Sequence, residues 1–137
     1  MSKQVLSIEQ MQHLEELGVD TSKANFYWHR TKSLNNYNDW DEWKLHYGVL
    51  RLARGFTKIN CQYVRTFTLQ DILDLLPATV DDDYRLYIDK GLVLWTVGYV
   101  DAASEEIYED FRERDLIDAA YEMLCWCIVN GYVETKK

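Results

Sequence analysis

The chain has 137 residues, of which 47% are hydrophobic and 14% aromatic, and its formal net charge at pH 7 is −8. This length fits one domain whose core needs no disulfide or metal, and the apolar content excludes a disordered chain. The acidic balance disfavours binding of nucleic acid by the surface as a whole.

The first predicted element is an amphipathic helix of about ten residues, which begins after the capping residue Ser7 and ends at Gly18. The aromatic stretch Asn25–Arg30 alternates between two faces and predicts a strand. A second, shorter helix is expected over Leu69–Leu76, because Thr68 caps it and a proline follows it.

Three further strands form a predicted antiparallel meander over Asp83–Lys90, Leu92–Val100 and Glu106–Asp110. The first alternates polar and apolar residues, and Lys90 with Gly91 forms a turn signal. The second is apolar on both faces, which is typical of a central strand.

The last predicted element is a helix with Asp115 at its N-cap and Gly131 after its end. No residue from Met123 to Val129 is polar, so the helix must be covered on more than one side. We expect Trp95 and Trp126 in the core, because each buries a large area on an apolar face.

The segment from Thr31 to Arg65 has no clean period and is rich in aromatic and basic residues. A helix from Asp41 to Leu52 and a strand over Val49–Phe56 are both compatible with it. From Arg30 to Arg65 there are seven basic and three acidic residues, a net of +4, so the rest of the chain carries −12. This asymmetry indicates an interacting arm or self-complementarity.

Together these elements predict a single α+β domain over residues 1–137, with a basic aromatic insertion at about 31–65. The expected order is αβ–insertion–αβββα, with a mainly antiparallel sheet of three to five strands. The C-terminal helix is expected to be buried against that sheet.

Several runs of the sequence resemble small uncharacterised proteins of phages and prophages in gut bacteria. These runs are Ser7–Met11, Leu17–Ala24, Phe67–Pro77, Tyr84–Ile88, Trp95–Tyr99 and Ala119–Cys127. More distantly, strands followed by a helix with an Ala-Ala-x-x-x-Leu core resemble the phage ABA-sandwich family, a helix–sheet–helix fold. The resemblance implies a phage-type accessory protein, and its motifs are structural, so no functional residue is carried over.

No motif in the sequence points to catalysis or to a metal. The histidines His13, His29 and His46 lack HxxxH or HxH spacing, and there is neither a GxSxG motif nor a P-loop. Asp81–Asp83 lacks the glycine and terminal glutamate of a calcium loop, and no histidine is placed to activate Cys61. We therefore expect no enzyme activity, no cofactor and no metal site.

The location expected from the sequence is the cytoplasm, without contact to a membrane. The first residues lack the apolar segment of a secretory signal, and the longest apolar runs are shorter than a membrane span. The three cysteines are odd in number and form no CxxC pair, which is typical of reduced thiols.

The strongest functional signal is the mixture of aromatic and basic side chains in the insertion. Its candidate binding residues are Tyr37, Trp40, Trp43, Tyr47, Arg51 and Arg54. Such a mixture suits stacking on single-stranded nucleic acid, although the same aromatic residues could instead cover the final helix. The preferred hypothesis is a non-enzymatic phage-type protein that acts through protein contacts, with an unidentified partner or itself as a homodimer. The alternative is a nucleic-acid-binding module that uses residues 30–65.

Overall fold

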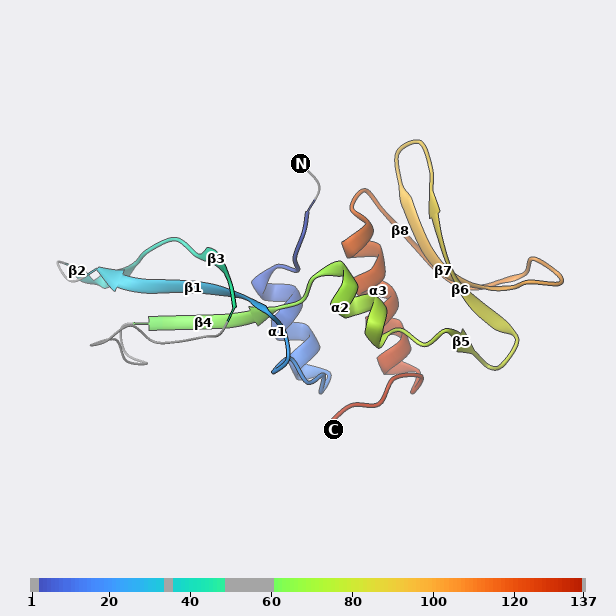
Figure 1. Cartoon of the computed structure of the whole chain (residues 1–137), viewed down its shortest axis with the longest axis horizontal. Helices are drawn as coiled ribbons and strands as arrows, with labels where there is room; N and C mark the ends of the chain where they lie inside the picture. The colour runs from blue at the N-terminus through green and yellow to red at the C-terminus, as the bar shows by residue number, and fades with distance from the viewer. Residues whose placement is uncertain (1–2, 34–35, 49–60, 137) are drawn as a thin grey trace.

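The computed structural model describes residues 3–33, 36–48 and 61–136 (Figure 1). Its elements, in chain order, are α1 (Ile8–Glu16), β1 (Phe26–Ser33), β2 (Asn36–Trp40), β3 (Lys44–Tyr47), β4 (Cys61–Thr66), α2 (Leu69–Leu75), β5 (Thr79–Val80), β6 (Tyr84–Lys90), β7 (Trp95–Asp101), β8 (Ile107–Glu113) and α3 (Leu116–Val129).

The strands form two antiparallel sheets, and the three helices lie between them (Figure 1). In the first sheet β1 pairs with β3 over Phe26–His29, with β4 over Phe26–Thr31 and with β2 at its last two residues. The second sheet has the order β5-β6-β7-β8. We call the first sheet the arm, and the helices with the second sheet the body. The predicted α+β fold is confirmed. The predicted strand over Asn25–Arg30, however, is part of β1 and belongs to the arm, whereas the meander forms the second sheet.

The described residues of the predicted insertion belong to the arm. Lys44–Tyr47 form β3, which pairs with Phe26–His29 of β1, so a helix starting at Asp41 is wrong. Pairing with an aromatic strand decides the conformation here, because helical spacing alone is a weak signal. The alternative strand over Val49–Phe56 lies outside the described residues.

The arm is attached to the body through the segment that precedes α1. The carbonyl of Leu6 accepts hydrogen bonds from Trp28 Nε1 at 3.0 Å and from Thr66 Oγ1 at 2.7 Å. The backbone N–H of Leu6 donates to the carbonyl of Phe67 at 3.0 Å. Leu6 is fully buried, so these bonds hold both β1 and β4 at the arm's base.

The meander agrees with its prediction in order and pairing, and β7 lies between β6 and β8 as a central strand should. Gly98 is required in β7, because a Cβ there would come within 2.6 Å of the Tyr87 ring. The predicted strand over Leu92–Val100 begins later, at Trp95, so the prediction of strand for its first three residues is wrong. They form a loop, which Gly91 closes by donating its N–H to the carbonyl of Leu94 at 2.9 Å.

The predicted ends of the helices are confirmed. Ser7 and Thr68 each cap a helix in a capping box, with Gln10 and Asp71 as the respective partners. Gly131 follows α3 with a φ of 81°, where a side chain would be strained. The capping side chains bind neighbouring backbone groups, which explains why local sequence was sufficient to find them.

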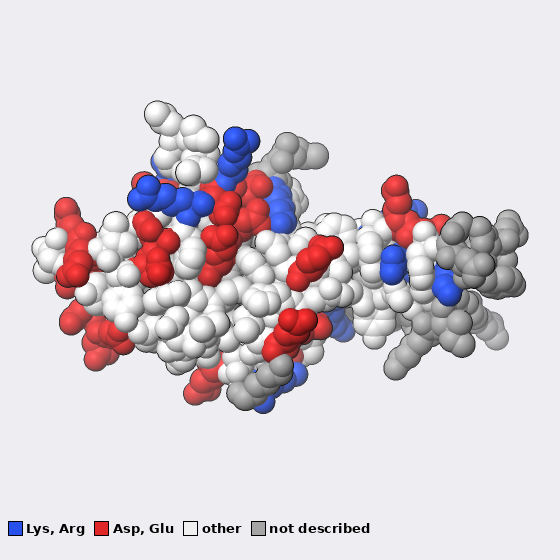
Figure 2. All heavy atoms as spheres, turned by 180° about the vertical axis from the view of Figure 1, so that it is seen from behind, with Lys and Arg blue, Asp and Glu red and all other residues white. Residues whose placement is uncertain are grey.

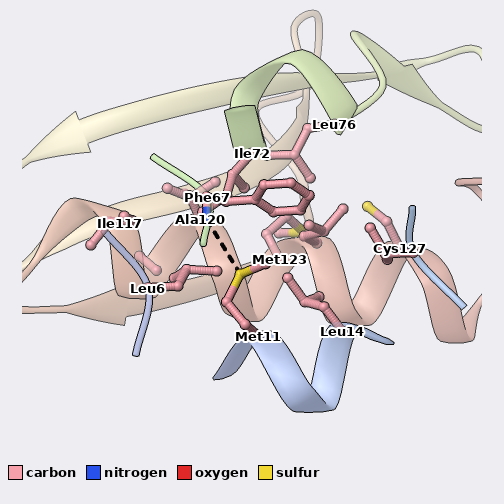
Figure 3. Close-up of a cluster of buried hydrophobic side chains, with 14 of the residues drawn as sticks. Leu6, Met11, Leu14, Phe67, Ile72, Leu76, Ile117, Ala120, Met123 and Cys127 are labelled. Atoms are coloured by element: carbon pink, nitrogen blue, oxygen red, sulfur yellow. Dashed lines mark hydrogen bonds between the residues drawn. The ribbon is translucent and has the colours of Figure 1, made fainter. Parts of the chain in front are cut away.

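α3 is covered on two sides, as its apolar sequence requires. Leu14 from α1 and Ile72 from α2 pack with Met123 of α3 (Figure 3), and Tyr99 from β7 belongs to the same core cluster. All three, like Met123 of α3 itself, are 0% exposed. The second cover is therefore made by α1 and α2, and none of the described aromatic side chains of the arm belongs to this core cluster.

The remaining side of α3 is not buried. Tyr121, Glu122 and Cys125 are half-buried there, and Val129 is 72% exposed. Asp115 is the N-cap residue as predicted, but its side chain makes no capping hydrogen bond. The expectation of a buried C-terminal helix thus holds for the two packed sides only.

Trp95 and Trp126 are half-buried and do not belong to the fully buried core. Trp126 packs at the edge of the core, with its ring centre 5.6 Å from that of Tyr108 and 5.4 Å from that of Tyr132. Trp95 is the first residue of β7, so its ring lies at the end of the sheet, with the ammonium of Lys90 5.4 Å from its centre. The sequence pattern identified an apolar face but not how far along the strand the core extends.

The core predicts a large difference between two leucines on helices. Leu124→Ala removes a 0% exposed side chain, so we expect it to lower the free energy of unfolding by about 2–5 kcal/mol. Leu75→Ala removes a side chain that is 37% exposed, and should cost less than about 1 kcal/mol. Urea unfolding of both variants measures this difference, and equal losses would contradict the described core.

Candidate functional site

Two of the predicted binding residues, Trp40 and Trp43, lie together near the β2 end of the arm (Figure 1). The guanidinium carbon of Arg30 is 4.9 Å from the ring centre of Trp40 and 4.4 Å from that of Trp43. Lys32 Nζ is 5.0 Å from the ring centre of Trp40. These four residues, here named the Trp–Arg cluster, hold one another by attraction between cations and indole faces.

The other predicted binding residues are not brought to this cluster by the described structure. Tyr47 packs on Phe26, with ring centres 4.9 Å apart, and is 72% exposed. Phe26 lies four residues from Arg30 and six from Lys32 along β1, so Tyr47 is about 13–20 Å from the cluster, given the rise of a β-strand. Tyr37 belongs to β2, but its side chain, together with Arg51 and Arg54, lies outside the described part of the chain.

The opposite face of the arm carries a thiol–imidazole pair that sequence reasoning missed. His29 Nε2 lies 2.9 Å from Cys61 Sγ, and the His29 ring centre is 5.4 Å from that of His46. Burial raises the pKa of the Cys61 thiol, while burial and the charge of His46 lower the pKa of His29. Both shifts favour neutral groups, whereas a cysteine nucleophile needs a thiolate.

This pair arises from strand register. Thr31 is opposite Cys61 and His29 is opposite Tyr63, so the side chains of His29 and Cys61 share one face. The two residues are 32 positions apart in the chain, and no local spacing relates them. Only the pairing of the two aromatic alternating segments could have indicated it.

The loop between β6 and β7 exposes three consecutive aliphatic side chains. Leu92–Leu94, here named the hairpin tip, are 106%, 69% and 40% exposed in chain order. The loop is tight, because the N–H of Gly91 bonds to the carbonyl of Leu94 and Lys90 is paired with Trp95. The loop projects from the end of the second sheet (Figure 1). The fold therefore presents these side chains to solvent on a fixed support.

A second surface is an open groove of about 450 Å³ along the outer side of α3. Its floor and walls are mostly aromatic or apolar and come from α1, β8 and α3. The main lining residues are His13, Phe111, Tyr121, Glu122, Cys125 and Trp126.

Glu122 of the groove forms a carboxyl pair with Glu113, the last residue of β8. Burial, followed by the hydrogen bond with Glu113 and its charge, raises the pKa of Glu122 to about 7. Within residues 3–33, 36–48 and 61–136, no lysine or arginine forms a salt bridge with either carboxyl group. Glu122 therefore loses its proton only around neutral pH.

Among the described residues, no three His, Cys, Asp or Glu side chains converge in a way that could hold a metal ion. Asp81 and Asp82 form part of the turn before β6, with φ values of 49° and 63°, and Asp81 accepts a hydrogen bond from the Tyr132 hydroxyl at 2.8 Å. All three cysteines are free thiols. In the same part of the chain no helix has both the length and the apolar character to cross a membrane.

Comparisons with protein-family models, with curated proteins and with solved structures found no match to this chain. The resemblance to phage and prophage proteins therefore stays a prediction. No relative contributes functional residues, so the candidate sites depend on the geometry of this chain.

The carboxyl pair predicts a dependence of stability on pH. The pKa of Glu122 is about 7 in the folded chain against a usual 4.5, so between these values the folded state holds a proton that the unfolded state has lost. Stability should therefore fall as pH rises from 4.5 to 7, and this contribution should be absent from Glu122→Gln. Thermal unfolding from pH 4 to pH 8 measures the difference, and parallel curves for the two proteins would exclude a raised pKa.

Proposed function

We propose that the chain is a non-enzymatic accessory protein of phage or prophage type that binds another protein through the hairpin tip. The observation that carries this proposal is the exposure of three consecutive aliphatic side chains, Leu92–Leu94, on a tight loop. An apolar cluster that folding leaves in water is stabilised when a partner covers it.

The form of the loop favours strong binding for its size. The hydrogen bond between Gly91 and Leu94 and the pairing of Lys90 with Trp95 order the loop before a partner arrives. A preorganised loop loses little conformational entropy on binding, so more of the apolar burial appears as affinity.

The charge of the molecule favours a protein over a lipid surface as the partner. The net charge is −8, and acidic side chains are spread over the body (Figure 2). Anionic membranes attract basic segments, and an acidic body would be repelled. A second copy of the chain is a special case of a protein partner, and the experiment below distinguishes it by mass.

The proposal is tested by placing a photocrosslinking amino acid at Leu92 and, as a matched control, at Val129. Both positions are exposed and apolar, but only the first belongs to the hairpin tip. Irradiation of cells that express the chain should give a discrete crosslinked product from position 92 and none from position 129. The added Val93→Ser substitution should abolish the product without lowering the melting temperature, because Val93 is 69% exposed.

A crosslinked product of twice the chain mass would identify the homodimer, and a different mass a second protein. Equal products from positions 92 and 129, or no effect of Val93→Ser, would contradict binding through the tip.

A second candidate function is binding of single-stranded nucleic acid by the arm. The observation that favours it is the Trp–Arg cluster, in which Arg30 lies 4.9 Å and 4.4 Å from the two indole ring centres and Lys32 lies 5.0 Å from that of Trp40. Rings of this kind stack on bases, and cations contact phosphates. The cations already pair with the rings, which is why this candidate is second.

Fluorescence anisotropy with a labelled single-stranded oligonucleotide at about 50 mM salt tests this candidate. The double substitution Trp40→Ala and Trp43→Ala should weaken binding by about tenfold or more, given that stacking contributes about 1–3 kcal/mol per base. Tyr63→Ala, on the opposite face of the arm, is the matched control. No binding at this salt concentration, or equal weakening by both changes, would exclude the Trp–Arg cluster as the site.

A further inference from the structure

We propose that the outer edge of β8 binds an extended segment of another protein, which adds to the second sheet as an antiparallel strand. One apolar side chain of that segment enters the groove along α3, and a basic side chain stands two residues before and two residues after it. This surface is separate from the hairpin tip, and the inference does not depend on the proposed function.

Strand β8 ends the second sheet, and its outer edge is accessible. Within the described part of the chain, only β7 pairs with it. All seven residues of β8 are half-buried or exposed, whereas four of the seven residues of β7 are buried. A free edge of this kind presents unpaired backbone N–H and C=O groups to solvent, which is the template that an added strand requires.

The hydrogen bonds around Asp110 show which backbone groups of β8 face outward. The N–H of Asp110 donates to the side-chain carboxylate of Glu109 at 3.1 Å. Its cross-strand partner is Gly98, and Asp101, three residues farther along β7, donates its N–H toward β8 at 2.8 Å. Because bonding alternates along a strand, Gly98 faces β6, and the backbone groups of Asp110 and Arg112 face away from β7.

The face of β8 that lies toward α3 carries an acidic, an aromatic and an acidic side chain in turn. Phe111 pairs with the buried Val97 and lines the groove along α3. Glu109 and Glu113 lie two residues on either side of Phe111, and residues two apart share a face of the sheet. An added strand would therefore place one side chain opposite Phe111 and its neighbours on that face opposite the two glutamates.

The groove enlarges the apolar contact available to the central side chain. Phe111 and Trp126 both line it, so a branched aliphatic side chain would be buried between β8 and α3. Only two residues connect β8 to α3, so the helix runs back along the strand, and the Tyr108 ring centre is 5.6 Å from that of Trp126. Residues 109–113 thus run beside the part of α3 that precedes Trp126, and Val129 lies about one turn beyond this contact.

The backbone groups of the edge select an extended ligand. A helix satisfies its own backbone N–H and C=O groups, and so it would leave those of Asp110 and Arg112 to water. An extended segment bonds to them directly, which is how strand addition gains affinity.

The charges select a basic segment. On the α3 face Glu109 and Glu113 are both acidic, whereas on the opposite face Asp110 pairs with Arg112 at 3.4 Å. Cross-strand pairs of opposite charge are stabilising and like charges are destabilising. The segment that fits is therefore basic, apolar and basic at alternate positions on its α3 face.

The probe is the peptide acetyl-Thr-Lys-Thr-Val-Thr-Lys-Thr-amide, titrated into the full isotope-labelled chain and followed by NMR. It should bind with a dissociation constant of about 1 mM or lower and slow the hydrogen exchange of the Asp110 and Arg112 amides. N-methylation of the threonine after valine removes an N–H that faces β8, and should weaken binding about tenfold or more. N-methylation of the valine, whose N–H faces away from β8, is the matched control and should leave the affinity within about twofold. Glutamate in place of both lysines should weaken binding about tenfold or more.

A pair of variants tests the same edge from the side of the protein. Arg112→Pro removes an outward N–H at a position where an edge strand accepts proline, and should weaken peptide binding about tenfold or more. Arg112→Ala keeps the N–H and loses the same ion pair with Asp110, so it should bind the peptide like the unmodified chain. Melting temperatures of the two variants show whether both are folded, and the N-methylated peptides provide the test on the unmodified chain.

Equal affinity of the two N-methylated peptides, unchanged binding by a folded Arg112→Pro variant, or no binding at about 10 mM peptide would overturn the inference. Equal binding of the lysine and glutamate peptides would also overturn it. The variant Val93→Ser should bind the peptide like the unmodified chain. Loss of the tip's crosslinked product with intact peptide binding would leave the β8 edge in place, and failure of the peptide with an intact crosslink would leave only the proposed function.

Discussion

The structure depends on the burial of α3 from two sides. The helix has no polar residue over its last two turns, and so neither a sheet alone nor a helical layer alone could cover it. Leu14 and Ile72 supply one layer and Tyr99 the other, and all are 0% exposed. Because α1, α2 and the second sheet each need α3 as their apolar partner, the three parts of the body are stable only together.

The arm is tied to this body at its base, by polar contacts and by Val64 of β4, which packs against the body's core. The carbonyl of Leu6 accepts hydrogen bonds from Trp28 Nε1 and Thr66 Oγ1. Farther out, all four residues of β3 are exposed. A sheet of this kind derives its order from cross-strand ring and cation contacts, such as those of Arg30 with Trp40 and Trp43. Its aromatic content therefore has a structural explanation that does not require a ligand.

The hairpin tip and the carboxyl pair lack such an explanation. Exposed leucines add nothing to the core, and a carboxyl group whose pKa is raised to about 7 destabilises the fold when it ionises. A feature that lowers stability or solubility and has no role in packing can be stabilised when a partner binds to it. Both lie toward the same end of the second sheet, since Trp95 pairs with Glu113, but Leu92–Leu94 line the other face of that sheet with Thr96 and Arg112.

Local sequence by itself determined the helices capped by Ser7 and Thr68 and the order of the meander, since capping and alternation involve neighbouring residues. Only the tertiary structure decided where apolar residues meet water: the apolar run before Trp95 is a loop and not a strand. The pairs His29–Cys61 and Glu113–Glu122 were likewise undetermined by sequence. Strand register and the packing of α3 on β8 bring these residues together, and neither is encoded in any short segment.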